Sequence, residues 1–147
     1  HMPATHMPAT AAYGALALRL TLGVAALSHG LMKLLVFTPA GTVKYFASLG
    51  LPEIAAYAVI AAEVGGGLLL IAGAYVSVVS LALVPVLLGA LWVHSGNGWV
   101  FSAPKGGWEF PAFWTLALVA QALLGAGAYA VKVPALPFLA QPQRAAA

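Results

Sequence analysis

Residues 54–94 read IAAYAVIAAEVGGGLLLIAGAYVSVVSLALVPVLLGALWVH, two long apolar runs joined by the short connection AYV (74–76). A transmembrane helix needs about 20 predominantly apolar residues, and each run supplies them. Because the connection is so short, the two helices must lie antiparallel as a hairpin. This stretch predicts a helical membrane protein and the pairing of two of its helices.

The composition of the whole chain points to the same environment. Of its 147 residues, 63% are hydrophobic and 6% are charged, whereas an average soluble domain has about 25% charged residues. We therefore expect the lipid bilayer as the chain's surroundings. The few basic residues form no cluster, so no nucleic-acid partner is expected. The chain has no cysteine, which excludes thiolate and disulfide chemistry by its own side chains.

Two further apolar runs complete the predicted fold. The first ends before the helix-breaking cluster Thr38-Pro39-Ala40-Gly41, and the last begins at Glu109 and Pro111, which suit a first helical turn. The predicted spans are about 11–37, 53–73, 76–95 and 109–131. The fold class is an all-α integral membrane protein, a four-transmembrane-helix bundle with up-down-up-down topology.

The ends of the chain are read separately. Residues 1–10 repeat HMPAT and look like a duplicated cloning scar, so they are excluded from the reasoning. Residues 11–133 form a single transmembrane domain, and residues 134–147 are expected to be a flexible C-terminal tail.

Ionisable residues gather in one half of the predicted bundle. Alternating helix direction brings together the end of the first span, the start of the second, the end of the third and the start of the fourth. Ionisable residues inside a membrane are costly and normally face the bundle interior, where they find partners. We therefore predict a buried polar network of five residues, namely His29, Lys33, Glu63, His94 and Glu109.

Two features of these spans have two readings each. Arg19 lies on the same stripe of the first span as Lys33, and it either reaches the near interface as an anchor or pairs with Glu63. The glycines at 65–67 either make room for a ligand beside Glu63 or let a neighbouring helix approach.

A metal site is not predicted. Two imidazoles and a carboxylate, from His29, His94 and Glu63, would suit iron or zinc. No two of them have a metal-ligand spacing within one helix, however, and Lys33 would repel a cation.

Aromatic residues gather in sequence around the same side of the bundle. Trp92, Trp99 and Trp108 are candidates for lining a ligand site, and the competing reading is an aromatic belt at the membrane interface. The connection between Gly96 and Trp108 is unusually apolar, which is compatible with a lid.

Several motifs occur together in a fixed order: RLTLG (19–23), HGLMK (29–33), LGLP (49–52), EVGGG (63–67) and HSGNGW (94–99). In this respect the chain resembles the DoxX family of small four-helix membrane proteins over nearly its whole length outside the tag and tail. The family pattern falls on Arg19, His29, Lys33, Glu63, His94 and Glu109.

The resemblance implies a function in redox chemistry. DoxX relatives are described as a subunit of a thiosulfate:quinone oxidoreductase or as parts of membrane oxidoreductase complexes. The resemblance thus implies a membrane subunit or accessory of a quinone-linked oxidoreductase system, whose His/Lys/Glu network binds quinone or a similar small apolar ligand. The alternative is a non-catalytic carrier or binding protein for a small apolar or weakly acidic molecule.

The expected partners and location follow from this reading. We expect no covalently bound cofactor, quinone as the candidate ligand and an oxidoreductase subunit as the candidate partner, and homo-oligomers remain open. A bacterial or archaeal cell membrane is the expected location. Lysine and arginine are balanced between the two sides, so the sequence assigns no orientation.

Overall fold

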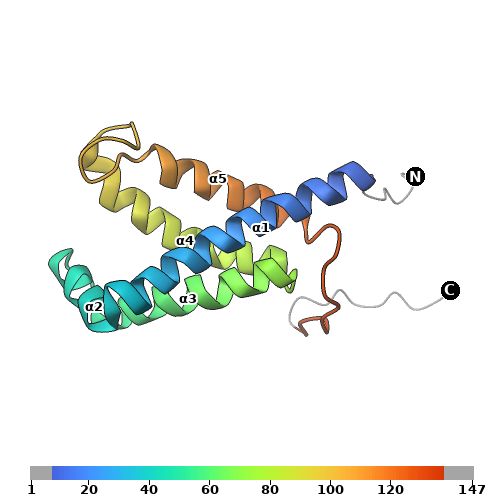
Figure 1. Ribbon diagram of the computed structural model, residues 1–147, viewed down its shortest axis with the longest axis horizontal. Helices are drawn as coiled ribbons and strands as arrows, with labels where there is room; N and C mark the ends of the chain where they lie inside the picture. Colours follow the sequence, from blue (N-terminus) through green and yellow to red (C-terminus); the bar gives the residue numbers. More distant parts are fainter. Residues whose placement is uncertain (1–7, 138–147) are drawn as a thin grey trace.

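The computed structural model describes residues 8–137, and its regular elements are all helical (Figure 1). The predicted all-α fold is thereby confirmed. The elements, in chain order, are α1 (Ala9–Leu31), a π-helical segment (Met32–Val36), α2 (Thr38–Ser48), α3 (Glu53–Ala72), α4 (Val76–His94), a 3-10 turn (Ser95–Asn97) and α5 (Glu109–Leu124).

Three of the helical stretches are long and apolar enough to cross a membrane: 9–36, 53–72 and 76–97. The fourth, α5, has 16 residues, which corresponds to about 24 Å at 1.5 Å per residue, shorter than a hydrocarbon core of about 30 Å. The predicted end of this helix near Val131 is wrong. Gly125 has a φ of 78°, a left-handed value that glycine adopts readily and that ends the helix although the sequence stays apolar.

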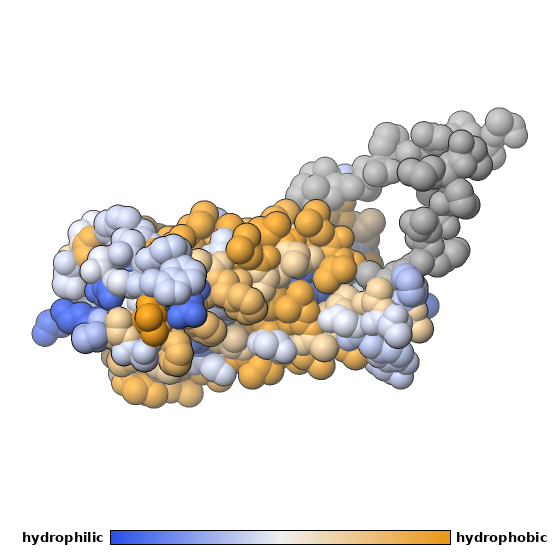
Figure 2. All heavy atoms as spheres, turned by 90° about the horizontal axis from the view of Figure 1, so that it is seen from above, coloured by the Kyte–Doolittle hydropathy of each residue, from blue (hydrophilic) through white to orange (hydrophobic). Residues whose placement is uncertain are grey.

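The surface agrees with a membrane-spanning chain. Figure 2 shows apolar residues across the middle of the molecule and more hydrophilic residues towards the two ends of its long axis. A helix that is apolar on its outer side as well as its inner side is typical of a membrane span. The long axis is therefore the direction in which the helices cross the bilayer.

The helices pack in two close pairs, α1 with α3 and α4 with α5 (Figure 1). Glycines make the first pair possible, because a Cβ on Gly67 would lie 2.7 Å from the amide nitrogen of Leu27 and 2.8 Å from the carbonyl oxygen of Gly23. Gly66 faces the Leu83 side chain on α4, whereas a Cβ on Gly65 would meet no neighbour within 4 Å. Glycines 66 and 67 therefore serve helix approach, the second of the two readings.

The α2 helix was not predicted. The cluster at 38–41 does end the first span, but it also begins a new helix, since proline is tolerated in a first helical turn. The Thr38 hydroxyl supports that turn by accepting a hydrogen bond from the Gly41 amide at 3.2 Å. The helix lies at one end of the bundle, beside the start of α3 (Figure 1).

The ends of the domain differ in part from the sequence reading. Ala9 and Thr10, assigned to the cloning scar, already belong to α1, and residues 1–7 lie outside the described residues. Residues 125–137 follow α5 without helix or strand. The predicted flexible tail, 134–147, lies outside the described residues from position 138 onwards.

Candidate ligand-binding cavity

A cavity of about 820 Å³ lies between the helices, and residues from all five of them line it, together with residues of the loop between α4 and α5. Most of the lining is apolar. The side chains that border it and carry a charge or an imidazole are His29, Lys33, Glu63 and His94, and the phenol of Tyr45 lines it as well. The cavity is open to the outside, since Trp92, Phe101 and Phe110 line it and are 60%, 68% and 51% exposed.

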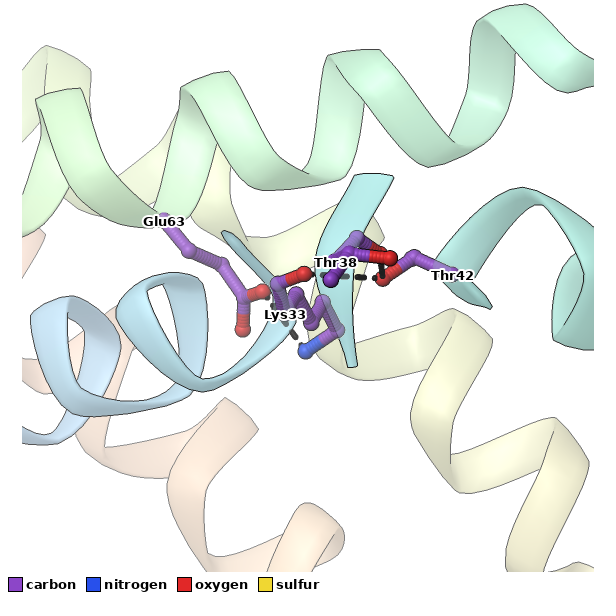
Figure 3. A network of polar contacts seen from close by, with 4 residues as sticks. All are labelled: Lys33, Thr38, Thr42 and Glu63. Atoms are coloured by element: carbon purple, nitrogen blue, oxygen red, sulfur yellow. Dashed lines mark hydrogen bonds and ion pairs between the residues drawn. The ribbon is translucent and has the colours of Figure 1, made fainter. Parts of the chain in front are cut away.

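Lys33 and Glu63 form an ion pair in this cavity, with 2.7 Å between Nζ and Oε1 (Figure 3). Their side chains are 22% and 7% exposed, so the carboxylate is the more deeply buried partner. The contact is an ion pair without the geometry of a hydrogen bond, since Glu63 Oε1 has no hydrogen-bond partner. An ammonium has three N–H donors, and the Lys33 side chain makes no hydrogen bond within residues 8–137, so its donors are free to meet a ligand in the cavity that it borders.

His29 lies one helical turn before Lys33 and is half buried. Its ring packs edge-on against Trp114, with 5.1 Å between ring centroids and an interplanar angle of 67°. Neither ring nitrogen has a hydrogen-bond partner in the described part of the chain, and the ring borders the cavity. The imidazole is thus available to a ligand.

His94 ends α4 and connects the cavity to the following loop. Its Nδ1 lies 3.2 Å from the carbonyl oxygen of Gly106, which also accepts a hydrogen bond from the Asn97 side chain at 2.8 Å. His94 therefore borders the cavity while holding the loop that covers one end of it.

Glu109 is not brought to the other four residues of the predicted network. Its Oε2 accepts a hydrogen bond from the amide of Phe101 at 3.0 Å, and its own amide donates to the carbonyl of Trp99 at 3.0 Å. It does not belong to the lining of the cavity. The role of Glu109 in this structure is to close the loop between α4 and α5.

The aromatic lining differs from the prediction. Trp92 borders the cavity, but Trp99 and Trp108 do not, and these two rings pack against each other with centroids 4.4 Å apart. Trp114, which is 6% exposed, lines the cavity instead. Phe110 and Trp114 belong to the same group of aromatic residues in the sequence; they are four residues apart and so share one face of α5, a spacing that favours them as lining.

Arg19 does not pair with Glu63, because Lys33 does. Arg19 is 1% exposed, and its side chain bonds the backbone of the protein. All of its guanidinium nitrogens donate to backbone carbonyls. The acceptors are Leu70 and Ile71 at 3.1 and 2.7 Å, and Ala126, Ala128 and Tyr129 at 2.8, 2.7 and 3.1 Å. Arg19 joins the end of α3 to the segment that follows α5, favoured there by the negative end of the helix dipole.

Metal ligands do not gather around the cavity. Between residues 8 and 137, no group of three histidine, aspartate or glutamate side chains is placed to hold a metal ion. What the arrangement does offer is a charged donor, a carboxylate and two imidazoles in apolar surroundings. Such groups can bind a small ligand and exchange protons with it.

The fold and the cavity together define a small helical membrane protein with an ion pair inside an apolar pocket. A profile of the DoxX family matches residues 14–96, and the chain belongs to this family. The match spans α1 to α4 and includes Arg19 and four ionisable cavity residues, His29, Lys33, Glu63 and His94, while Glu109 lies beyond it.

One curated relative is a protein of Bacillus subtilis (strain 168) named "Putative oxidoreductase CatD". It is 36% identical over 78 residues, which cover 53% of this chain and 57% of the relative. The aligned part therefore spans little more than half of either protein. No solved structure matches the chain.

Proposed function

We propose that the chain is a membrane subunit or accessory of a quinone-linked oxidoreductase system and that its cavity binds quinone or a similar small apolar ligand. The observation that carries this proposal is the Lys33–Glu63 ion pair inside an otherwise largely apolar cavity of about 820 Å³. Small-molecule sites typically measure about 300–1,000 Å³ and combine an apolar lining with a few polar groups.

The side chains suit a ligand that carries oxygen atoms on an apolar ring. The Lys33 ammonium donates a hydrogen bond to a carbonyl oxygen, and Glu63 receives a proton as the carboxylate and supplies one as the carboxylic acid. Reduction of a quinone to a quinol takes two electrons and two protons. In this proposal the partner subunit supplies the electrons, and the chain binds the ring and moves protons.

The relative supports the redox part of the proposal through its name alone. Its bacterial source supports a cell-membrane location for this chain. The loop between α4 and α5, which carries the exposed rings of Trp99 and Phe101, then lies at the membrane interface, where aromatic residues are favoured.

Quinone binding is tested with protein purified in mild detergent. A short-chain quinone is titrated while tryptophan fluorescence is followed, because Trp92 and Trp114 border the cavity and quinones quench indole emission. We expect saturable quenching that decreases in a Trp114→Phe variant. Quenching that rises linearly with quinone concentration, as free collision produces, would refute the proposal.

Variants of the ion pair assign the binding to the cavity. Lys33→Met and Glu63→Gln are each expected to weaken binding about 10- to 100-fold, the equivalent of one hydrogen bond with a charged group. Lys44→Met and Glu53→Gln remove the same charges at exposed positions outside the cavity lining. Equal losses in both sets of variants would mean that quinone binds elsewhere.

The alternative is a carrier or binding protein without catalysis, and the open, half-exposed mouth of the cavity favours ligand exchange with the surroundings. Liposome uptake of a labelled weak acid tests it. Uptake that falls in Glu63→Gln, together with quinone-dependent activity that is unchanged by the same substitution, would select the carrier over the redox subunit.

A further inference from the structure

The segment that carries Lys33 has an unusual backbone. Residues 32–36 are π-helical, and the amide of Phe37 donates to the carbonyl of Met32, five residues earlier, at 3.0 Å. An α-helix makes this bond between residues four apart, so the π-helical turn is wider and redirects the side chains on it. Such turns are rare and often occur at functional sites.

A buried threonine on the next helix contacts this segment. The Thr42 hydroxyl is 3.1 Å from the carbonyl oxygen of Lys33 and 2.9 Å from that of Thr38 (Figure 3). Thr42 is 3% exposed, and its single hydroxyl proton is shared between the two carbonyls. A bond to the carbonyl four residues earlier is ordinary for a helical threonine. The bond to Lys33, nine residues earlier, is not.

Two other threonines show the ordinary pattern. Thr21 bonds only the carbonyl of Ala17, at 2.8 Å, and Thr115 only that of Pro111, at 2.7 Å. Neither lines the cavity. Thr42 is thus distinguished by its second acceptor, which belongs to the lysine of the ion pair.

The junction between the π-helical segment and α2 is also strained. Thr38 has a φ of 66°, a left-handed value that a β-branched residue rarely adopts. Such a conformation persists only where surrounding contacts impose it. The hydrogen bonds of Thr38 with Gly41 and Thr42 are contacts of this kind.

We propose that Thr42 is a positioning residue, whose hydroxyl holds the π-helical segment in the shape that directs Lys33 towards Glu63. Without the hydroxyl, the Lys33 carbonyl loses its side-chain donor and the segment is free to relax. The ammonium then no longer meets the carboxylate in one fixed geometry. The consequence for ligand affinity rests on the proposed function, whereas the consequence for the ion pair does not.

The test compares Thr42→Val, which keeps the shape and removes the hydroxyl, with Thr42→Ser, which keeps the hydroxyl. The matched control is Thr21→Val, which removes an ordinary helical bond to Ala17, and neither of these residues lines the cavity. We expect Thr42→Val to weaken binding of the short-chain quinone about three- to tenfold, the equivalent of one hydrogen bond. Thr42→Ser and Thr21→Val should keep the wild-type affinity. Equal affinities for the valine and serine variants would overturn the proposal.

A second measurement does not depend on any ligand. The loss in melting temperature caused by Thr42→Val is measured in the wild type and in a Glu63→Gln background. A positioning role predicts a smaller loss in the Glu63→Gln background, because no ion pair remains to be oriented. A purely structural role predicts the same loss in both backgrounds and would overturn the proposal. If the wild type binds no quinone but the two losses differ, the proposed function fails while the role of Thr42 stands.

Discussion

Removing both partners of the Lys33–Glu63 pair is expected to destabilise the protein by less than the sum of the losses from removing each partner alone. At the observed 2.7 Å, the attraction between the two charges is roughly 6 kcal/mol for an effective dielectric constant of about 20. Burial of each ion costs several kcal/mol, so the pair as a whole contributes little net stability. A single substitution removes the attraction and leaves the cost of burial for the survivor.

The exposures of the two side chains make the expected losses unequal. Lys33→Met leaves the Glu63 carboxylate, only 7% exposed, without its partner, and we expect a loss of about 3–5 kcal/mol. Glu63→Gln leaves an ammonium that is 22% exposed towards an open cavity, so the loss should be smaller. The double variant should lose less than the sum of the two single losses.

The assay is reversible unfolding by an ionic detergent mixed into mild-detergent micelles, followed by circular dichroism for all four members of the cycle. The exposed pair of substitutions Lys44→Met and Glu53→Gln serves as the control and should be additive. Additive losses for Lys33→Met and Glu63→Gln would refute the reasoning, because they would mean that each side chain stabilises the bundle independently.

Three further outcomes follow from particular contacts. Gly67→Ala should cost about 1–3 kcal/mol in the same detergent-unfolding assay, because its Cβ would meet backbone atoms of α1. Gly65→Ala, with open space around it, should be neutral or stabilising. Arg19→Lys should lower the free energy of unfolding by about 2–6 kcal/mol, since the three N–H donors of an ammonium cannot serve five carbonyl acceptors. A loss under about 1 kcal/mol would mean that this set of hydrogen bonds, the Arg19 clamp, does not hold the end of α3 to the segment after α5. Thr38→Asn should raise the unfolding midpoint by an amount equivalent to about 1 kcal/mol, because asparagine tolerates a positive φ and keeps an acceptor for the Gly41 amide. An unchanged or lower midpoint would argue against strain where the π-helical segment meets α2.

The sequence predicted what depends on the pattern of apolar residues. Long apolar runs identified the membrane-crossing helices, and the alternation of their directions assigned Lys33 and Glu63 to the same half of the bundle. The α2 helix was not predicted because Pro39 and Gly41 were interpreted as a helix break, although both residues are compatible with a first helical turn. The end of α5 was predicted too late in the chain because Gly125 stops the helix within a run that remains apolar up to Val131.

The polar partners were harder to predict. The acceptors of Arg19 are backbone carbonyls, which every residue carries, so no residue type in the sequence marks them. Glu109 bonds the backbone of its own loop for the same reason. Only the partner of Lys33 is a charged side chain, and a charged side chain is visible in a sequence.

The clamp made by Arg19 has a consequence for the biogenesis of the protein. Its guanidinium is synthesised early, its acceptors on α3 follow 51 and 52 residues later, and those after α5 follow 107 to 110 residues later. Hydrocarbon offers no acceptors to a charged side chain in the meantime. Nη1 of Arg19 finds its acceptors once α3 is made, but Nε and Nη2 lack theirs until residues 126–129 emerge, so we expect them to stay in contact with water or the insertion machinery until then. Ribosomes stalled before and after that point should differ sharply in how firmly the first helix is held in the bilayer.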